Sequence, residues 1–169
     1  SVTRATLEQG SNTLTVDVSE DADGNKTYTA SDTARTETPD TAAAQAFISS
    51  AATLYFSSSA DFKPTDEALA AYGLAEPSAT LTVEWTRTDD ASGAQESVTS
   101  VLYLGAVDAN GDYYARLADS NAVSTLNATA LSGVLGMTLD GMLPTEEESA
   151  PESAPASESG SVSAASAAD

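Results

Sequence analysis

Residues 72–117 constrain the fold of this chain most. They begin with a helix stop, because Gly73 can take the positive φ at a helix end and Pro77 forbids continuation. Residues 80–86 then alternate between apolar and polar side chains, which is the period of a strand with one buried face. Two more strands follow after turn-forming residues, one ending at Gly105 and one over residues 113–117. The stretch therefore predicts an antiparallel meander of three strands.

The residues before the meander predict a hairpin group. Residues 2–8 alternate weakly and residues 13–18 alternate well, and a Gly-Ser-Asn turn signal separates them. A second turn leads into a third short strand, expected over residues 26–30. Asp-Gly and Gly-Asn pairs tolerate positive φ, which suits these turns.

An amphipathic helix is predicted from residue 39 to about residue 55. Thr38 is its expected N-cap and Pro39 its first helical residue. The apolar residues of its buried stripe recur every four positions as Ala43, Phe47, Ala51 and Tyr55. Short helices are expected at Asp66 and over residues 128–135. The predicted fold class is therefore α+β, with an antiparallel sheet, one main helix and two short ones.

The chain is predicted to form one α+β domain over residues 1–144, followed by a tail. Residues 145–169 are acidic and rich in Ser, Ala and Pro, and their only apolar residue besides Ala and Pro is Val162. Such a segment buries too little apolar surface to offset its chain entropy, so we expect disorder there.

Composition excludes several classes of function. The net charge of −20 opposes binding to phosphate backbones and anionic membrane surfaces, so no nucleic-acid partner is expected. The chain has neither Cys nor His, which removes thiol nucleophiles, Cys/His zinc sites and the Ser-His-Asp triad. No apolar run is long enough to span a membrane. Because the chain starts at Ser1 rather than Met, we expect that a further segment precedes it.

Two loops resemble the start of a calcium loop, with alternating acids and amides: Asp21, Asp23 and Asn25, and Asp108, Asn110 and Asp112. An EF-hand loop needs glycine at position six and a bidentate Glu at position twelve. Position six is Lys26 or Tyr113, and position twelve is Asp32 or Asp119. We therefore interpret both loops as hairpin turns and predict no metal ligands, with a calcium-stabilised surface domain as a less favoured alternative.

Carboxylate pairs and aromatic residues are the other candidate sites. The acids at Asp89 and Asp90 fall in a predicted turn, and the three at residues 146–148 fall in the tail, so neither group indicates a hydrolase. We predict no catalytic residue and no cofactor. The aromatic candidates for a binding platform are Trp85, Tyr103, Tyr113 and Tyr114. Aromatics on neighbouring strands more often pack in the core, and the last two must point to opposite faces.

The central stretch resembles a known family. Tyr72, Gly73 and Leu74 with Pro77, the strand end at Gly105 and the segment 113–117 are similar in order and spacing to the DUF4340 family of bacterial proteins. The resemblance is best over residues 65–135, looser over residues 1–64 and absent from the tail. It implies an extracytoplasmic module of unassigned activity that commonly follows an N-terminal membrane anchor, and it provides no catalytic residue.

These observations lead to one functional expectation and its alternatives. We expect a non-enzymatic accessory or protein-interaction domain, anchored to a bacterial membrane and exposed at the cell surface or envelope, with a protein partner in that envelope. The first alternative is a surface module that binds a glycan or a peptide through an exposed aromatic and an open sheet edge. A calcium-stabilised domain and a hydrolase rank below it.

Overall fold

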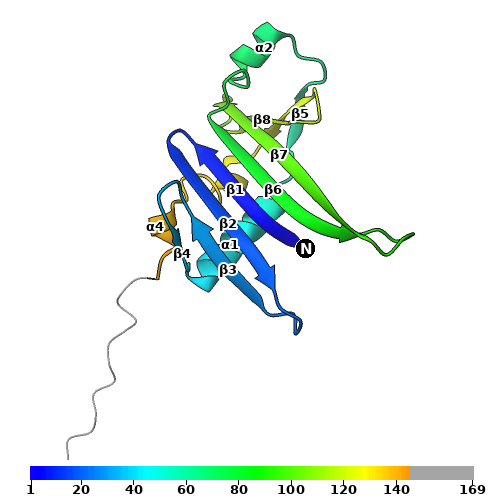
Figure 1. Ribbon diagram of the computed structural model, residues 1–169. Coiled ribbons are helices and arrows are strands. Elements are labelled where there is room, and N and C mark those ends of the chain that lie inside the picture. The colour runs from blue at the N-terminus through cyan, green and yellow to red at the C-terminus, as the bar shows by residue number, and fades with distance from the viewer. Residues whose placement is uncertain (145–169) are drawn as a thin grey trace, which may run out of the picture.

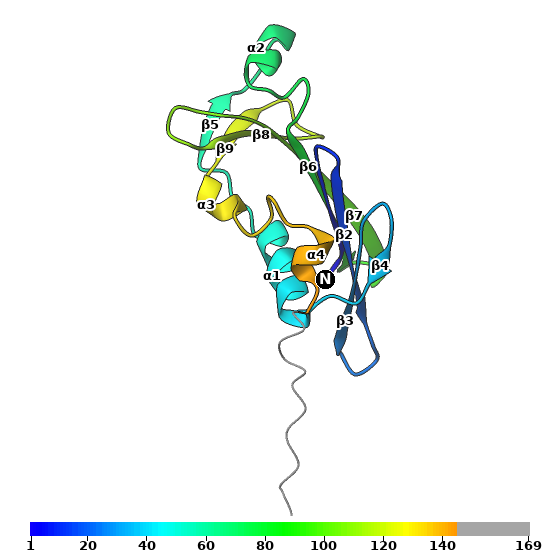
Figure 2. The same ribbon diagram turned by 90° about the vertical axis from the view of Figure 1, so that its left-hand side faces the viewer.

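The computed structural model describes residues 1–144, and the predicted tail lies outside the described residues. These residues form one twisted sheet, with most of the helices on one of its faces and the helix at residues 66–71 at one end of the sheet (Figures 1 and 2). Every neighbouring pair of strands in this sheet is antiparallel. The predicted α+β class, with its hairpin group and its meander, is confirmed.

The strands have the following bounds: β1 Val2–Gln9, β2 Asn12–Glu20, β3 Lys26–Ser31, β4 Thr36–Glu37, β5 Ser58–Asp61, β6 Ala79–Thr88, β7 Gln95–Val107, β8 Tyr113–Leu117 and β9 Val123–Leu126. In the sheet they follow the order β4-β3-β2-β1-β6-β7-β8-β9-β5. The helices are α1 Thr41–Ala52, α2 Asp66–Ala71, α3 Ala128–Leu131 and α4 Leu139–Met142. The sequence did not predict the two edge strands β4 and β5, which are short and lack alternation. The hairpin group joins the meander through β1 and β6, where Leu7 is opposite Leu81.

The hydrophobic core lies between the sheet and α1 (Figure 2). Alternate residues of β1, β2 and β6 face it, and Phe47 of α1 is the largest fully buried side chain. The strands therefore have one apolar and one polar face, as their alternation predicts. On the polar face, Arg4 of β1 forms an ion pair with Asp17 of β2 at 2.6 Å. Its exposure makes its contribution to stability small.

The main helix is shorter than predicted and begins later. Its N-cap is Asp40, whose side chain accepts a hydrogen bond from the Ala43 amide at 2.8 Å, so Thr38 and Pro39 lie outside it. Aspartate is among the most favoured N-cap residues, which explains this start. The helix ends at Ala52, and Tyr55, which was predicted to belong to the buried stripe, is 78% exposed.

Two glycines of the central stretch are in contact at the end of β7. Gly73 ends α2 with φ +69°, as predicted, and lies against the backbone of Gly105 and Ala106. The Ala106 amide donates a hydrogen bond to the Tyr72 carbonyl at 2.8 Å. A Cβ on Gly105 would lie 2.2 Å from that carbonyl oxygen. Gly73 and Gly105 therefore form a backbone contact that fixes α2 onto the sheet.

The last helical region differs from its prediction. The predicted helix over residues 128–135 forms only as far as Leu131, and a turn follows in which the Leu135 amide bonds to the Leu131 carbonyl at 2.8 Å. A Cβ added to Gly133 would lie 2.4 Å from the Ser50 hydroxyl oxygen, so this turn packs closely on α1. Helix α4 was not predicted, because four residues are too few for a periodic pattern.

Candidate functional site

One segment contains most of the exposed large hydrophobic side chains. In residues 1–144 these are Tyr55, Phe56, Phe62 and Val107, and the first three lie within eight residues of each other. The segment 55–62 begins shortly after α1 ends at Ala52, and it contains β5. Exposed apolar side chains are common singly, but a group of them on one segment is typical of a contact surface.

Strand β5 is held to the sheet on one side only. The Ser57 amide donates to the Thr125 carbonyl, and the hydroxyls of Ser58 and Thr125 are 2.8 Å apart. This second bond provides a partner for Thr125, the buried polar side chain of β9. Since β5 ends the strand order, its other side pairs with no strand in residues 1–144. It therefore exposes unpaired backbone groups beside the aromatic residues of segment 55–62.

The opposite edge of the sheet is better protected. Strand β4 has two residues, and Arg35 beside it forms ion pairs with Glu37 and Asp140. Short length and charged side chains are the usual means by which edge strands avoid pairing with another chain. Strand β5 has four residues and no Lys, Arg or Pro. Of the two edges, the β5 edge is the more open to an added strand.

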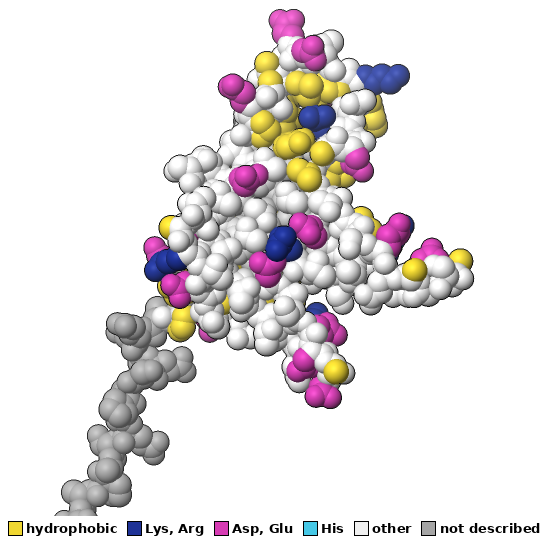
Figure 3. All heavy atoms as spheres, in the orientation of Figure 1, with side chains coloured by type: hydrophobic (Ala, Val, Ile, Leu, Met, Phe, Trp, Pro, Cys, Tyr) yellow, Lys and Arg dark blue, Asp and Glu magenta, His cyan; other side chains and the backbone are white. Residues whose placement is uncertain are grey.

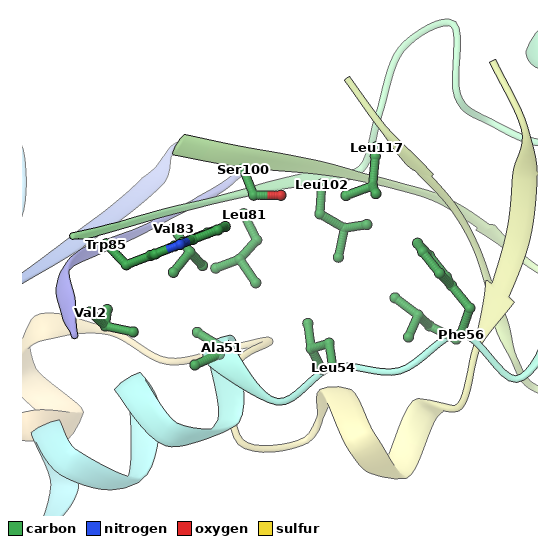
Figure 4. Close-up of a pocket in the computed structure, with 12 residues that line it drawn as sticks. Val2, Ala51, Leu54, Phe56, Leu81, Val83, Trp85, Ser100, Leu102 and Leu117 are labelled. Carbon is green, nitrogen blue, oxygen red and sulfur yellow. The ribbon is translucent and has the colours of Figure 1, made fainter. Parts of the chain in front are cut away.

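A cavity of about 350 Å³ lies between the sheet and the end of α1, next to this edge (Figure 4). Side chains of the sheet, among them Leu81, Trp85 and Leu102, face Leu54 and Phe56 across it. Phe56 is 44% exposed, so one of the aromatic residues of segment 55–62 also lines the cavity. The cavity and the exposed segment therefore form one continuous candidate site, which we call the β5-edge site.

The chemistry of the cavity is apolar. No charged residue lines it, and its polar side-chain groups are the Ser100 hydroxyl and the Trp85 indole nitrogen. A carboxylate or ammonium group placed there would lose its hydration without gaining a partner. Apolar pockets with a few polar groups are typical of ligand or anchor-residue sites. The cavity suits an uncharged, apolar group.

The aromatic residues predicted as candidates are distributed over both faces of the sheet. Trp85 and Tyr113 pack against the core, and Trp85 also lines the cavity. Tyr114 is on the opposite face, where its ring lies 4.6 Å from that of Tyr72. Tyr103 is on the same face beside Arg116, 5.4 Å from the guanidinium carbon to the ring centroid. The predicted opposite orientation of Tyr113 and Tyr114 is confirmed, and both are half-buried.

Of these tyrosines, Tyr103 and Tyr114 lie on the polar face of the sheet. Most of that face is covered by hydroxyl side chains, such as Thr6 and Thr15, whose oxygens are 3.1 Å apart. Hydrophobic side chains gather near α2, at the end of the sheet that holds β8 (Figures 1 and 3). The four aromatic candidates therefore do not form one platform.

The first acid of each calcium-like loop accepts hydrogen bonds from the amides of its own turn. The Asp21 carboxylate accepts hydrogen bonds from the Asp23 and Asn25 amides, each at 2.9 Å. The Asp108 carboxylate does the same for the Asn110 and Asp112 amides. No group of three or more acids in residues 1–144 is placed to hold a metal ion. The Asp21 and Asp108 carboxylates are therefore hydrogen-bond acceptors within their own hairpin turns.

The same bonding stabilises the ionised form of the turn carboxylates. A hydrogen bond from the Asn25 side chain, with those of the turn amides, lowers the pKa of Asp21. The Asp112 amide lowers the pKa of Asp108 in the same way. The Ser92 hydroxyl and amide lower the pKa of Asp89 in the turn between β6 and β7. Asp89, which was considered with Asp90 as a carboxylate pair, therefore stabilises its own turn. The acids at residues 146–148 lie outside the described residues.

We predict that replacing Asp89 by Ala destabilises the domain in a pH-dependent way. Because the folded-state pKa of Asp89 is lowered, its contribution is fully present above its unfolded pKa of about 3.9 and is lost as the pH falls through the lower folded value. Urea unfolding should separate the two proteins at pH 6 and bring them together in strong acid. Asp90→Ala controls for the lost charge, and an equal loss in both variants would contradict the assignment.

The sequence did not reveal the β5-edge site. Tyr55 was assigned to the helix, and Phe56 and Phe62 belong to no periodic pattern. The one available signal was a pair of adjacent large aromatics followed by three serines, which fits neither a helix face nor a half-buried strand. Such a signal indicates exposure without indicating what the residues contact.

Comparison with protein families gives one match. The family model described as "Domain of unknown function (DUF4340)" matches residues 33–141, which confirms the resemblance noted in the sequence and extends it towards the N-terminus. The matched residues include segment 55–62 and both contacting glycines. Comparisons with curated proteins and with solved structures found no match. Within residues 1–144, no helix combines the length and the apolar character needed to cross a membrane.

Proposed function

From the premise that this chain belongs to the DUF4340 family, we propose that it is a non-enzymatic, extracytoplasmic protein-interaction domain of a membrane-anchored bacterial protein. An extended segment of an envelope protein adds to the free edge of β5 and places an apolar side chain in the cavity. The observation that carries the proposal is the meeting of an unpaired edge, three exposed aromatics and an apolar cavity at segment 55–62.

The occupant is a protein segment because the site offers two kinds of contact that a peptide uses together. Backbone groups along β5 supply the hydrogen bonds of strand addition, which give affinity with little dependence on sequence. The cavity supplies a pocket for a side chain, which gives specificity. A segment with alternating large apolar residues satisfies both. Its charge is neutral or positive, since the chain carries a net charge of −20.

The cavity can be tested by filling it. Ser100 of β7 points into the cavity (Figure 4), and Ser100→Leu places apolar atoms where the partner's side chain would lie. We expect this variant to be more stable by about 1 kcal/mol, because apolar surface is buried. Emission of Trp85, the only Trp of the chain, should move to shorter wavelength as water leaves the cavity.

The functional test is capture of partners on native cells by crosslinking and mass spectrometry. Wild-type protein should recover one envelope protein repeatedly, and Ser100→Leu should recover about tenfold less. Thr99→Leu introduces a leucine side chain on the opposite, exposed face of β7 and should leave recovery of the partner unchanged. Recovery of cell-wall fragments alone, or equal recovery by all three proteins, would contradict the proposal.

A further inference from the structure

Four of the six Lys and Arg side chains form ion pairs, and the other two do not within residues 1–144. Arg4, Lys26, Arg35 and Arg87 each have a carboxylate partner. Within residues 1–144, Lys63 and Arg116 have no ion-pair partner, although the chain holds 26 acids. In so acidic a protein, two cations without carboxylates are unexpected, and both of them line one pocket.

That pocket is separate from the β5-edge cavity and lies beside α2. It has a volume of about 390 Å³ and is lined by Lys63, Pro64, Asp66, Leu69, Arg116 and Asn121. No residue lines both hollows. Arg116 comes from β8, whereas Lys63, Pro64 and Asp66 come from the start of α2 and the residues before it. The pocket therefore joins segments that are about fifty residues apart in the sequence.

Arg116 has a hydrogen-bond donor that remains unused. Its Nε is buried and has no acceptor in residues 1–144, and its Nη1 reaches the Ser120 carbonyl only at 3.4 Å. The guanidinium lies over the Tyr103 ring, with 5.4 Å between its carbon and the ring centroid, and this contact holds it in place. A buried charged donor without an acceptor is unfavourable and indicates a missing partner. The planar guanidinium of arginine binds bidentate acceptors best, which are carboxylates and phosphates.

We propose that this pocket binds the carboxylate group of a small ligand. Arg116 supplies its planar guanidinium charge, Lys63 a second positive charge, and the Asn121 amide a further hydrogen bond. Leu69 and Pro64 form an apolar wall for the part of the ligand that bears the carboxylate. The net charge of −20 disfavours a doubly charged phosphate more than a singly charged carboxylate. Asp66 at the same pocket repels the ligand and weakens its binding.

The test uses benzoate as the probe, with benzamide as its uncharged equivalent and phenyl phosphate as the competing anion. Binding is followed in the 169-residue chain by NMR, through the side-chain Nε–H resonance of Arg116. Benzoate should shift this resonance in a saturable way, with benzamide and phenyl phosphate at least about tenfold weaker. No saturable shift, an equal shift with benzamide, or tighter binding of phenyl phosphate would overturn the proposal.

Variants that should keep the fold intact distinguish a loss of binding from a loss of structure. Lys63 is exposed, so Lys63→Gln should leave the fold intact and weaken benzoate about threefold to tenfold. Arg87→Gln removes the same charge far from the pocket, at the ion pair with Glu96, and should change affinity little. Asp66→Asn should strengthen binding, whereas Asp90→Asn should not. Equal effects of Lys63→Gln and Arg87→Gln would show a general field effect and overturn the site.

Discussion

Gly105→Ala should destabilise the domain by about 2 to 4 kcal/mol, since an added Cβ would lie 2.2 Å from the Tyr72 carbonyl oxygen. That oxygen accepts the hydrogen bond from the Ala106 amide, so relief of the clash also breaks this bond. The atom that the Cβ would approach most closely is a backbone oxygen, so the backbone itself must move. Urea unfolding followed by circular dichroism measures the loss.

The control is Gly141→Ala in α4. A Cβ there meets only the Thr138 hydroxyl at 3.4 Å, an ordinary contact, and alanine favours the helix. This variant should be as stable as the wild type or slightly more so. If both variants lost the same stability, the contact between Gly73 and Gly105 would not be the feature that fixes α2 to the sheet.

Removal of the exposed aromatics should abolish most partner binding without unfolding the domain. Replacing Tyr55, Phe56 and Phe62 together by Ser should weaken capture of the envelope partner about thirtyfold or more, because large aromatics contribute most of the energy of such interfaces. Tyr55 and Phe62 are 78% and 76% exposed, so their loss should change the thermal midpoint little, whereas loss of Phe56, which is 44% exposed, should lower it slightly. Pull-down with the purified domain, at a series of concentrations, gives the affinity.

Val107→Ser is the matched control for this variant. Val107 is 50% exposed and is the remaining large hydrophobic residue exposed in residues 1–144, but it lies outside segment 55–62. Its replacement should leave binding unchanged. Equal weakening by both variants would show that the apolar surface binds without specificity, and the β5-edge site would be wrong.

Strand periodicity made most of the sheet predictable. The side chains at Leu81, Val83 and Trp85 all face the core side, as their alternation requires, and the hairpin of β1 and β2 has the predicted turn. The helix was predictable in type but not in its ends. Tyr55 continued the four-residue spacing of the stripe, yet the chain leaves the helix at Ala52 and Leu54 turns toward the cavity. Periodicity cannot detect such a change, because it records spacing and not tertiary contact.

The candidate site was less predictable than the fold. A cavity depends on how far α1 stands from the sheet, which no local pattern encodes. A free edge depends on strand order, and β5 pairs with β9 although more than sixty residues separate them. The signature glycines were visible in the sequence, but their mutual contact was not. The unused donor of Arg116 likewise follows from burial, which only the folded chain determines.

Site-resolved photocrosslinking tests the proposed interaction most directly. A benzophenone amino acid is placed at Ala60 in β5 or at Thr36 in β4, two exposed positions on the opposite edges of one sheet. The proposed function predicts that Ala60 crosslinks on native cells to one envelope protein, through an extended segment with alternating apolar residues, and that Thr36 does not. Equal crosslinking from both edges, or cell-wall glycan alone at Ala60, would contradict it.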